Sequence, residues 1–151
     1  MDVNHRTRTS RALFGLIAGV VIVCAAAYGL AMRYVTGPVP DDVRSAVFLS
    51  RVAASINPLF PRKVDAETEI TRVSALEGVF IYHYRFVNVA VAGVSAAVLA
   101  NLRPTVTRSS CGNAAALNNF IKKGITLRYF YSDQVGRALA TFDVTRADCG
   151  V

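Results

Sequence analysis

The chain has 151 residues and carries 17 lysines and arginines against 10 aspartates and glutamates, which gives a formal net charge of +7. The basic residues are scattered, and only Arg62-Lys63 and Lys122-Lys123 are adjacent pairs. A nucleic-acid-binding protein usually gathers its positive charge on one face, so we expect no nucleic-acid partner. We interpret both pairs as solvated surface residues, with a contact to anionic lipid or polymer as the alternative.

Residues 12–32 form an uncharged apolar run that is flanked by arginines. At about 1.5 Å per residue, a helix of this length spans about 31 Å, close to the roughly 30 Å hydrocarbon core of a bilayer. More arginines precede the run than follow it, which favours a cytoplasmic N-terminus. We predict a signal anchor in the inner (cytoplasmic) membrane. A signal peptide cleaved at the small residues within 25–31 is the alternative.

The same run contains a candidate surface for helix pairing. Gly15 and Gly19 form a G-x-x-x-G pair, a spacing that lets two membrane helices approach closely. The alternative is that the glycines only reflect the usual composition of membrane helices. Cys24 follows Val23 rather than a small residue, so we interpret it as an apolar membrane residue and not as a site of lipidation.

Four segments follow from this interpretation. Residues 1–11 form a basic cytoplasmic tail, 12–32 the transmembrane helix, 33–40 a short proline-containing linker, and 41–151 a domain on the far side of the membrane. In a bacterium, this domain lies in the periplasm or otherwise outside the cytoplasm. Its length suffices for one domain with a modest core.

The first half of this domain predicts a helix and a hairpin. A helix is expected over 41–57, because acidic residues suit its start and Asn57-Pro58 ends it. Alternation over 64–70 predicts a half-buried strand, Glu77-Gly78 a turn, and 79–89 a second strand.

The second half predicts two helices and another hairpin. A short helix over 95–102 is limited by Pro104, and a second helix is capped by Asn113 and stopped by Gly124. Alternation and a turn then predict the last two strands, over 125–131 and 138–144. The order α-β-β-α-α-β-β predicts an α+β fold, with a four-stranded antiparallel sheet and the helices packed on one face. The pairing between the two hairpins is left open.

Two cysteines, Cys111 and Cys149, lie in the predicted exported domain. An even number of cysteines in an oxidising compartment favours one disulfide, which would join the start of the second helix in this half to the end of the last strand. The alternative is a redox-active or metal-binding pair. No C-x-x-C motif is present, and no histidine is near either cysteine in sequence.

Residues with catalytic chemistry are few in this domain. Its one histidine, His83, stands between two tyrosines and is expected to point away from the aromatic face. Three acidic residues alternate on the first predicted strand, where they favour a solvated strand over an acid-base or calcium site: Asp65, Glu67 and Glu69. Ser109-Ser110 lacks a nucleophile-elbow pattern. We therefore predict no catalytic residues, no metal site and no cofactor.

An aromatic stripe is the candidate binding face. If the second and third predicted strands are neighbours, four tyrosines share one side of the sheet: Tyr82, Tyr84, Tyr129 and Tyr131. Tyrosine combines apolar area with a hydroxyl and is favoured at protein interfaces. The alternative is that the stripe forms the core under the helices.

From Pro61 onward the chain resembles a loosely defined group of small bacterial envelope proteins without an assigned activity. The resemblance lies in Val64-Asp65-Ala66-Glu67-Thr68, Tyr82-His83-Tyr84, Cys111, Gly124-Ile125-Thr126-Leu127-Arg128-Tyr129 and Asp148-Cys149. It implies an exported, disulfide-bonded domain and carries no catalytic residues.

The leading hypothesis is a non-enzymatic, membrane-anchored accessory or binding protein of the bacterial envelope. Its partner would be another envelope protein or a second copy, bound through a face or an edge of the sheet. One alternative is a small hydrolase or thiol-redox protein that uses the cysteines or His83. Another is a subunit of a larger membrane complex, in which the face of Gly15 and Gly19 packs on another helix.

Overall fold

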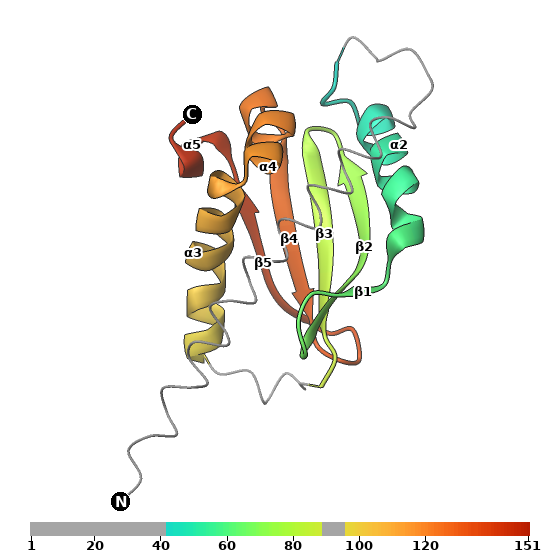
Figure 1. Ribbon diagram of the computed structural model, residues 1–151, viewed down its shortest axis with the longest axis vertical. Helices are drawn as coiled ribbons and strands as arrows, with labels where there is room; N and C mark the ends of the chain where they lie inside the picture. Colours follow the sequence, from blue (N-terminus) through green and yellow to red (C-terminus); the bar gives the residue numbers. More distant parts are fainter. Residues whose placement is uncertain (1–41, 89–95) are drawn as a thin grey trace, which may run out of the picture.

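The computed structural model describes residues 42–88 and 96–151, which form an α+β domain (Figure 1). The predicted tail, transmembrane helix and linker lie outside the described residues, as do Gly15, Gly19 and Cys24. None of the helices in the two described ranges combines the length and the apolar character that a membrane crossing requires.

A five-stranded mixed sheet forms the centre of the domain, with the order β1-β2-β3-β4-β5. Neighbouring strands are antiparallel except β3 and β4, which are parallel. The predicted four-stranded antiparallel sheet is therefore wrong in strand number and in one pairing. The strands are β1 (Arg62–Lys63), β2 (Thr68–Leu76), β3 (Val79–Phe86), β4 (Thr126–Ser132) and β5 (Ala138–Val144).

The parallel pair arises because the chain crosses over between the two hairpins. It leaves β3 at Phe86 and returns only at Thr126, after helices α3 (Ala96–Gly112) and α4 (Ala114–Asn119). Parallel strands need such a long connection, whereas antiparallel strands can be joined by a tight turn. β3 and β4 then pair without a register shift, from Val79 opposite Thr126 to Arg85 opposite Ser132.

The strand predicted over 64–70 is also wrong in its position, because β1 ends at Lys63 and β2 begins at Thr68. Asp65 accepts hydrogen bonds from the backbone N–H groups of Glu67 and Thr68, at 2.8 and 2.7 Å, and so closes a turn. This turn separates the short β1 from β2. An aspartate side chain that bonds to backbone groups two and three residues later competes with strand pairing, so the alternation in this segment marks a turn and not a continuous strand.

Helix α2 (Ala46–Ile56) begins later than expected and ends where expected. Ser45 caps it by accepting the N–H of Phe48, whereas Asp42 accepts the N–H of Arg44 in the turn before the helix. Asn57 and Pro58 end it, as the sequence predicts, and continue into a short 3-10 helix.

Helix α3 contains Pro104, so the prediction that this proline limits the helix is wrong. A proline removes the hydrogen bond to the carbonyl four residues earlier, here that of Ala100. Both Ala100 and Pro104 lie at exposed positions, where water can satisfy the carbonyl. The helix therefore continues to Gly112, and Cys111 lies in its last turn instead of at the start of α4.

The helices cover one face of the sheet, as predicted. Phe120 packs its ring 5.0 Å from that of Phe80, and Ser110 of α3 hydrogen bonds to Tyr129 of β4. The α2 side chains that join the same hydrophobic cluster are Phe48, Leu49, Val52, Ala53 and Ile56. The left-handed backbone of Gly124 (φ 76°) ends this helical region, also as predicted.

The C-terminus forms a short helix, α5 (Arg146–Cys149), instead of ending on a strand. A capping box between Thr145 and Asp148 starts it. A disulfide joins Cys111 and Cys149, whose Cα atoms are 5.2 Å apart. The pairing is the one that the sequence predicts, but it joins two helices, α3 and α5, instead of a helix start and a strand end.

Replacing both Cys111 and Cys149 with serine is expected to lower the free energy of unfolding by about 4 kcal/mol. The reason is that the bridge closes a loop with a sequence separation of 38 residues and so restricts the unfolded chain. Urea unfolding of the full chain measures the difference, with Cys24→Ser as a control that should match the native protein. An unchanged urea midpoint in the double variant would contradict this role.

Candidate functional site

The four tyrosines of the predicted binding face lie together on β3 and β4. Their exposed fractions are between 2% and 5%, and they belong to the hydrophobic core. Because β3 and β4 pair in register, the rings stack across the strands, with centroids 5.5 Å apart for Tyr82 and Tyr129 and 4.9 Å for Tyr84 and Tyr131. Burial of this kind favours the core interpretation over a ligand surface.

The three alternating carboxylates do not form a shared site. Asp65 lies in the turn between β1 and β2, where it binds backbone N–H groups. Glu69 lies on β2 and accepts the guanidinium of Arg85 on β3, with its Nε at 2.9 Å. In the part of the chain that the structure describes, no three His, Cys, Asp or Glu side chains are grouped to hold a metal ion.

His83 points away from the tyrosines, as predicted. Its Nε2 lies 2.8 Å from the Oγ of Ser74, and its ring lies against Phe130. Burial, assisted by the positive charge of Arg72, lowers the pKa of His83 from 6.5 to about 4. A serine and a histidine in contact are two parts of a hydrolytic triad, but the charged neighbour here is a cation, which opposes the imidazolium that a general base must become.

The two edges of the sheet differ in how their backbone groups are satisfied. At the β1 edge, β1 has only two residues, and β2 has a register irregularity near Ile70. The side chain of Asn57 then accepts the N–H of Val73 and donates to its carbonyl, at 2.8 and 3.0 Å. Short strands, bulges and side-chain plugs prevent further strand pairing.

The β5 edge has neither the short strand nor the side-chain plug, and its one register irregularity lies at its start, between Ala138 and Ala140. β5 is seven residues long and pairs with β4 on one side only. Within residues 42–88 and 96–151, no segment forms a backbone hydrogen bond to the outer side of β5. An edge strand of this length presents a row of N–H and C=O groups to which another chain can pair.

An open hollow of about 360 Å³ lies beside this edge. Helix α3 contributes Arg103 to it, and the sheet contributes Arg128 from β4 and three side chains from β5: Thr141, Phe142 and Asp143. The hollow therefore combines an aromatic side chain, two guanidinium groups and one carboxylate next to an unpaired strand edge. We name these five residues the β5 hollow.

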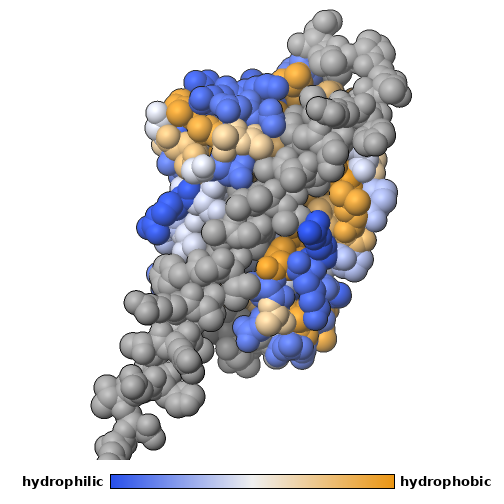
Figure 2. Space-filling model, viewed as in Figure 1, coloured by the Kyte–Doolittle hydropathy of each residue, from blue (hydrophilic) through white to orange (hydrophobic). Residues whose placement is uncertain are grey.

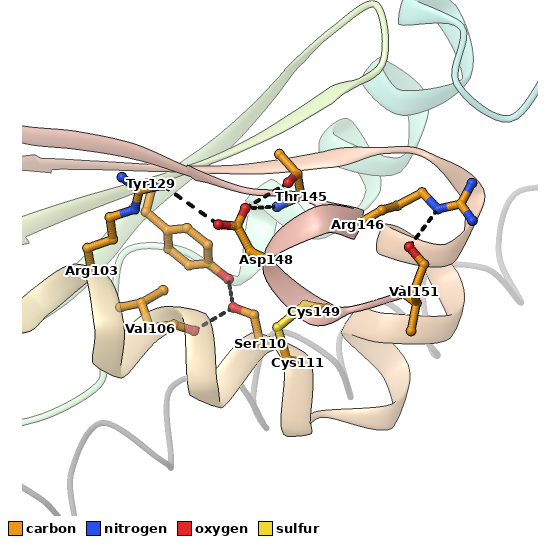
Figure 3. Close-up of a disulfide and its surroundings, with 10 residues drawn as sticks. All are labelled: Arg103, Val106, Ser110, Cys111, Tyr129, Thr145, Arg146, Asp148, Cys149 and Val151. Atoms are coloured by element: carbon orange, nitrogen blue, oxygen red, sulfur yellow. Dashed lines mark hydrogen bonds and ion pairs between the residues drawn. A yellow bond between two sulfur atoms is a disulfide. The ribbon is translucent and has the colours of Figure 1, made fainter.

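The two arginines of the β5 hollow are held differently. Arg128 binds Asp143 through two hydrogen bonds of 2.8 Å, and these bonds hold the pKa of Asp143 below its ordinary value. Arg103 lies 3.7 Å from Asp148, whose carboxylate already accepts the N–H and the hydroxyl of Thr145 (Figure 3). With a side chain 62% exposed, Arg103 is the loosely held cation of the site.

The disulfide lies next to this site. Figure 3 shows that Cys111 and Cys149 join α3 to α5. In the same view, Arg103 of α3 faces Asp148 of α5. Sequence reasoning found the bridge but none of the five residues of the β5 hollow. The available signal was the position of 138–144 as the last strand of the chain, but only the strand order shows that it is an edge.

No protein-family model matches the chain, and no curated protein matches its sequence. Solved structures share its fold. A protein of Pseudomonas aeruginosa that is classed as secreted superposes with a TM-score of 0.62 at 17% identity, over 75% of this chain and 99% of its own. A pilotin of the Vibrio vulnificus type 2 secretion system, EpsS, gives 0.58 at 18% identity, over 69% of this chain and 90% of its own.

A second pilotin, AspS of the Vibrio cholerae type II secretion system, gives a TM-score of 0.53 at 16% identity, over 69% of this chain and 91% of its own. At these identities, the likeness shows a shared fold. The structural neighbours of the chain are thus a secreted protein and two pilotins of secretion systems, and each neighbour is covered almost completely.

The stability of the domain is expected to fall as the pH drops from about 6.5 to about 4, in part because of His83. The unfolded chain binds a proton at this histidine below pH 6.5, whereas the folded domain resists it until about pH 4, so acid favours unfolding across that window. His83→Gln removes this contribution, while carboxylates titrate in both proteins. Urea unfolding at several pH values measures the difference, and an identical pH dependence in the variant would contradict the account.

Proposed function

We propose that the chain is a non-enzymatic accessory protein of the bacterial envelope that binds an extended segment of another envelope protein along β5. The observation that carries the proposal is that an edge strand without a side-chain plug lies next to the β5 hollow. Main-chain hydrogen bonds to an edge strand provide affinity, and neighbouring side-chain sites provide specificity. The fold shared with pilotins and a secreted protein supports a role of this class.

The chemistry of the β5 hollow defines the segment that it fits. Phe142 offers apolar area for one side chain of an added strand. Arg103, which is mostly exposed and weakly paired, offers a guanidinium for a carboxylate. Arg128 and Asp143 satisfy each other and so leave Arg103 as the group that selects charge. The partner segment is therefore extended, with an Asp or Glu next to an apolar residue.

The anchored topology is part of the same proposal. Residues 12–32 hold the chain in the inner membrane, and the domain lies outside the cytoplasm. The Cys111–Cys149 disulfide supports this location, because structural disulfides persist in oxidising compartments. The resemblance to small envelope proteins of unassigned activity supports it as well. In this topology Gly15 and Gly19 are the surface through which the anchor pairs with another membrane helix.

A hydrolase is the second candidate, because Ser74 and His83 are in hydrogen-bond contact. Two observations disfavour it. The pKa of His83 is lowered to about 4, and Arg72 opposes its protonation. A thiol-redox role is disfavoured in a similar way, because both cysteines are in one bridge that fixes helices α3 and α5 to each other.

A photo-crosslinking amino acid at Thr141 is expected to capture the partner in cells. Thr141 is exposed and lies in the β5 hollow. Arg103→Glu should remove most of the crosslinked product, since it places a carboxylate where the partner's carboxylate binds. Arg108→Glu, on an exposed position of the same helix, is the matched control and should leave the product intact. Mass spectrometry of the captured peptide should find Asp or Glu beside an apolar residue.

The same crosslinker at Ala54, an exposed position on α2, reports on the far side of the domain. Equal capture from Ala54, or capture from Thr141 that Arg103→Glu does not reduce, would contradict docking at β5. A peptide-hydrolysing activity that Ser74→Ala abolishes would replace the proposal with the hydrolase.

A further inference from the structure

Three segments meet at the end of the domain where the described chain begins, at the top of Figure 1. The N–H of Gly78, in the turn between β2 and β3, donates to the carbonyl of Arg44 at 2.8 Å. The N–H of Thr126, at the start of β4, donates to the carbonyl of Gly78 at 2.9 Å. The start of α2, the hairpin turn and the residues just before β4 therefore form one surface.

This surface is rich in exposed cations. Lys122 and Lys123 are both exposed on the short 3-10 helix that precedes Gly124. The exposed Arg44 lies beside them, because a Cβ placed on Gly78 or Gly124 would be 3.9 Å from its side chain. Two exposed carboxylates lie at the same end, where Asp42 accepts the N–H of Arg44 and Glu77 accepts the N–H of Ala46, both at 2.8 Å.

The same end also exposes aliphatic side chains. Val47, in the first turn of α2, is 62% exposed, and Leu76, at the tip of the hairpin, is 53% exposed. In Figure 2, hydrophilic and hydrophobic side chains lie next to each other over this end of the domain, near α4. We name Arg44, Lys122 and Lys123, together with Val47 and Leu76, the basic end.

The position of the basic end in the chain indicates what it contacts. The described domain begins at Asp42, and the apolar run ends at Met32 in the sequence. The nine residues between them span at most about 32 Å when fully extended, so in the proposed anchored topology this end lies near the bilayer. Cations beside exposed aliphatic side chains are the combination that binds anionic headgroups at a membrane surface.

We propose that the basic end binds the anionic lipid headgroups of the membrane in which the chain is anchored. This inference rests on the anchored topology of the proposed function. The lysines and Arg44 bind phosphate groups, and Leu76 and Val47 enter the interface between headgroups and acyl chains. The opposite end of the domain, with the turn between β4 and β5, then points away from the bilayer, and the β5 edge runs between the two ends, accessible to a partner.

The test uses the absence of tryptophan from the native sequence. Leu76→Trp introduces a single probe at the basic end of the full chain, which is reconstituted into vesicles of phosphatidylcholine with or without phosphatidylglycerol. With the anionic lipid, the emission of the tryptophan should shift to the blue and be quenched by lipids with brominated acyl chains. Val47→Trp is a second probe for the same end and should behave alike.

Val135→Trp is the matched control, because Val135 is 68% exposed and lies in the turn at the opposite end. Its emission should be insensitive to brominated lipids. Lys122→Gln with Lys123→Gln should reduce the quenching of Trp at position 76, whereas Arg62→Gln with Lys63→Gln, the other adjacent basic pair, should not. Quenching that is equal at positions 76 and 135, or equal with and without anionic lipid, overturns the inference.

A flotation assay on the same samples separates this inference from the proposed function. A chain that floats with the vesicles and shows no quenching at positions 47 and 76 retains its anchor and overturns only the lipid contact. A chain that does not float overturns the anchored topology and the lipid contact together. Neither result bears on docking at β5, which is measured by crosslinking.

Discussion

The parallel pairing of β3 with β4 is the constraint on which the rest of the domain depends. It places the two central strands in register, so that four tyrosines stack across them on one side while His83 and Phe130 face the other. It also requires a crossover connection that returns the chain from one end of the sheet to the other between β3 and β4. Helices α3 and α4 belong to this connection, and they cover the tyrosines.

The crossover also makes the two edges of the sheet unequal. Because the second hairpin is added beyond β3, the last strand of the chain becomes an edge, and α3 lies beside it with Arg103 directed toward Asp148 (Figure 3). The disulfide then fixes the end of α3 to α5. The opposite edge is closed by a two-residue strand and by the side chain of Asn57. The proposed docking site is therefore the edge that the described residues leave without a side-chain plug.

Local features of the domain could be predicted from the sequence, whereas its long-range pairing could not. Asn57-Pro58, Glu77-Gly78 and Gly124 end or turn the chain because their backbone preferences are local, and the structure confirms all three. The helix end predicted at Pro104 was wrong because an exposed helix position tolerates the missing hydrogen bond. The strand predicted over 64–70 was wrong because the turn at Asp65 interrupts the alternating pattern. Whether β3 meets β4 in parallel depends on packing between distant segments, which no local pattern encodes. The β5 hollow follows from that pairing, so its residues were not predictable either.

Amide hydrogen exchange of the full chain, followed by mass spectrometry, tests the central claim most directly, since it reports on the β5 edge in the native state. The account predicts slow exchange throughout β3 and β4, which are paired on both sides. It predicts fast exchange at alternate amides of β5, whose outward N–H groups face solvent, and slower exchange there when the partner segment is bound. Protection of β5 equal to that of β4 in the isolated protein would show that the edge is already covered, and it would contradict docking at this site.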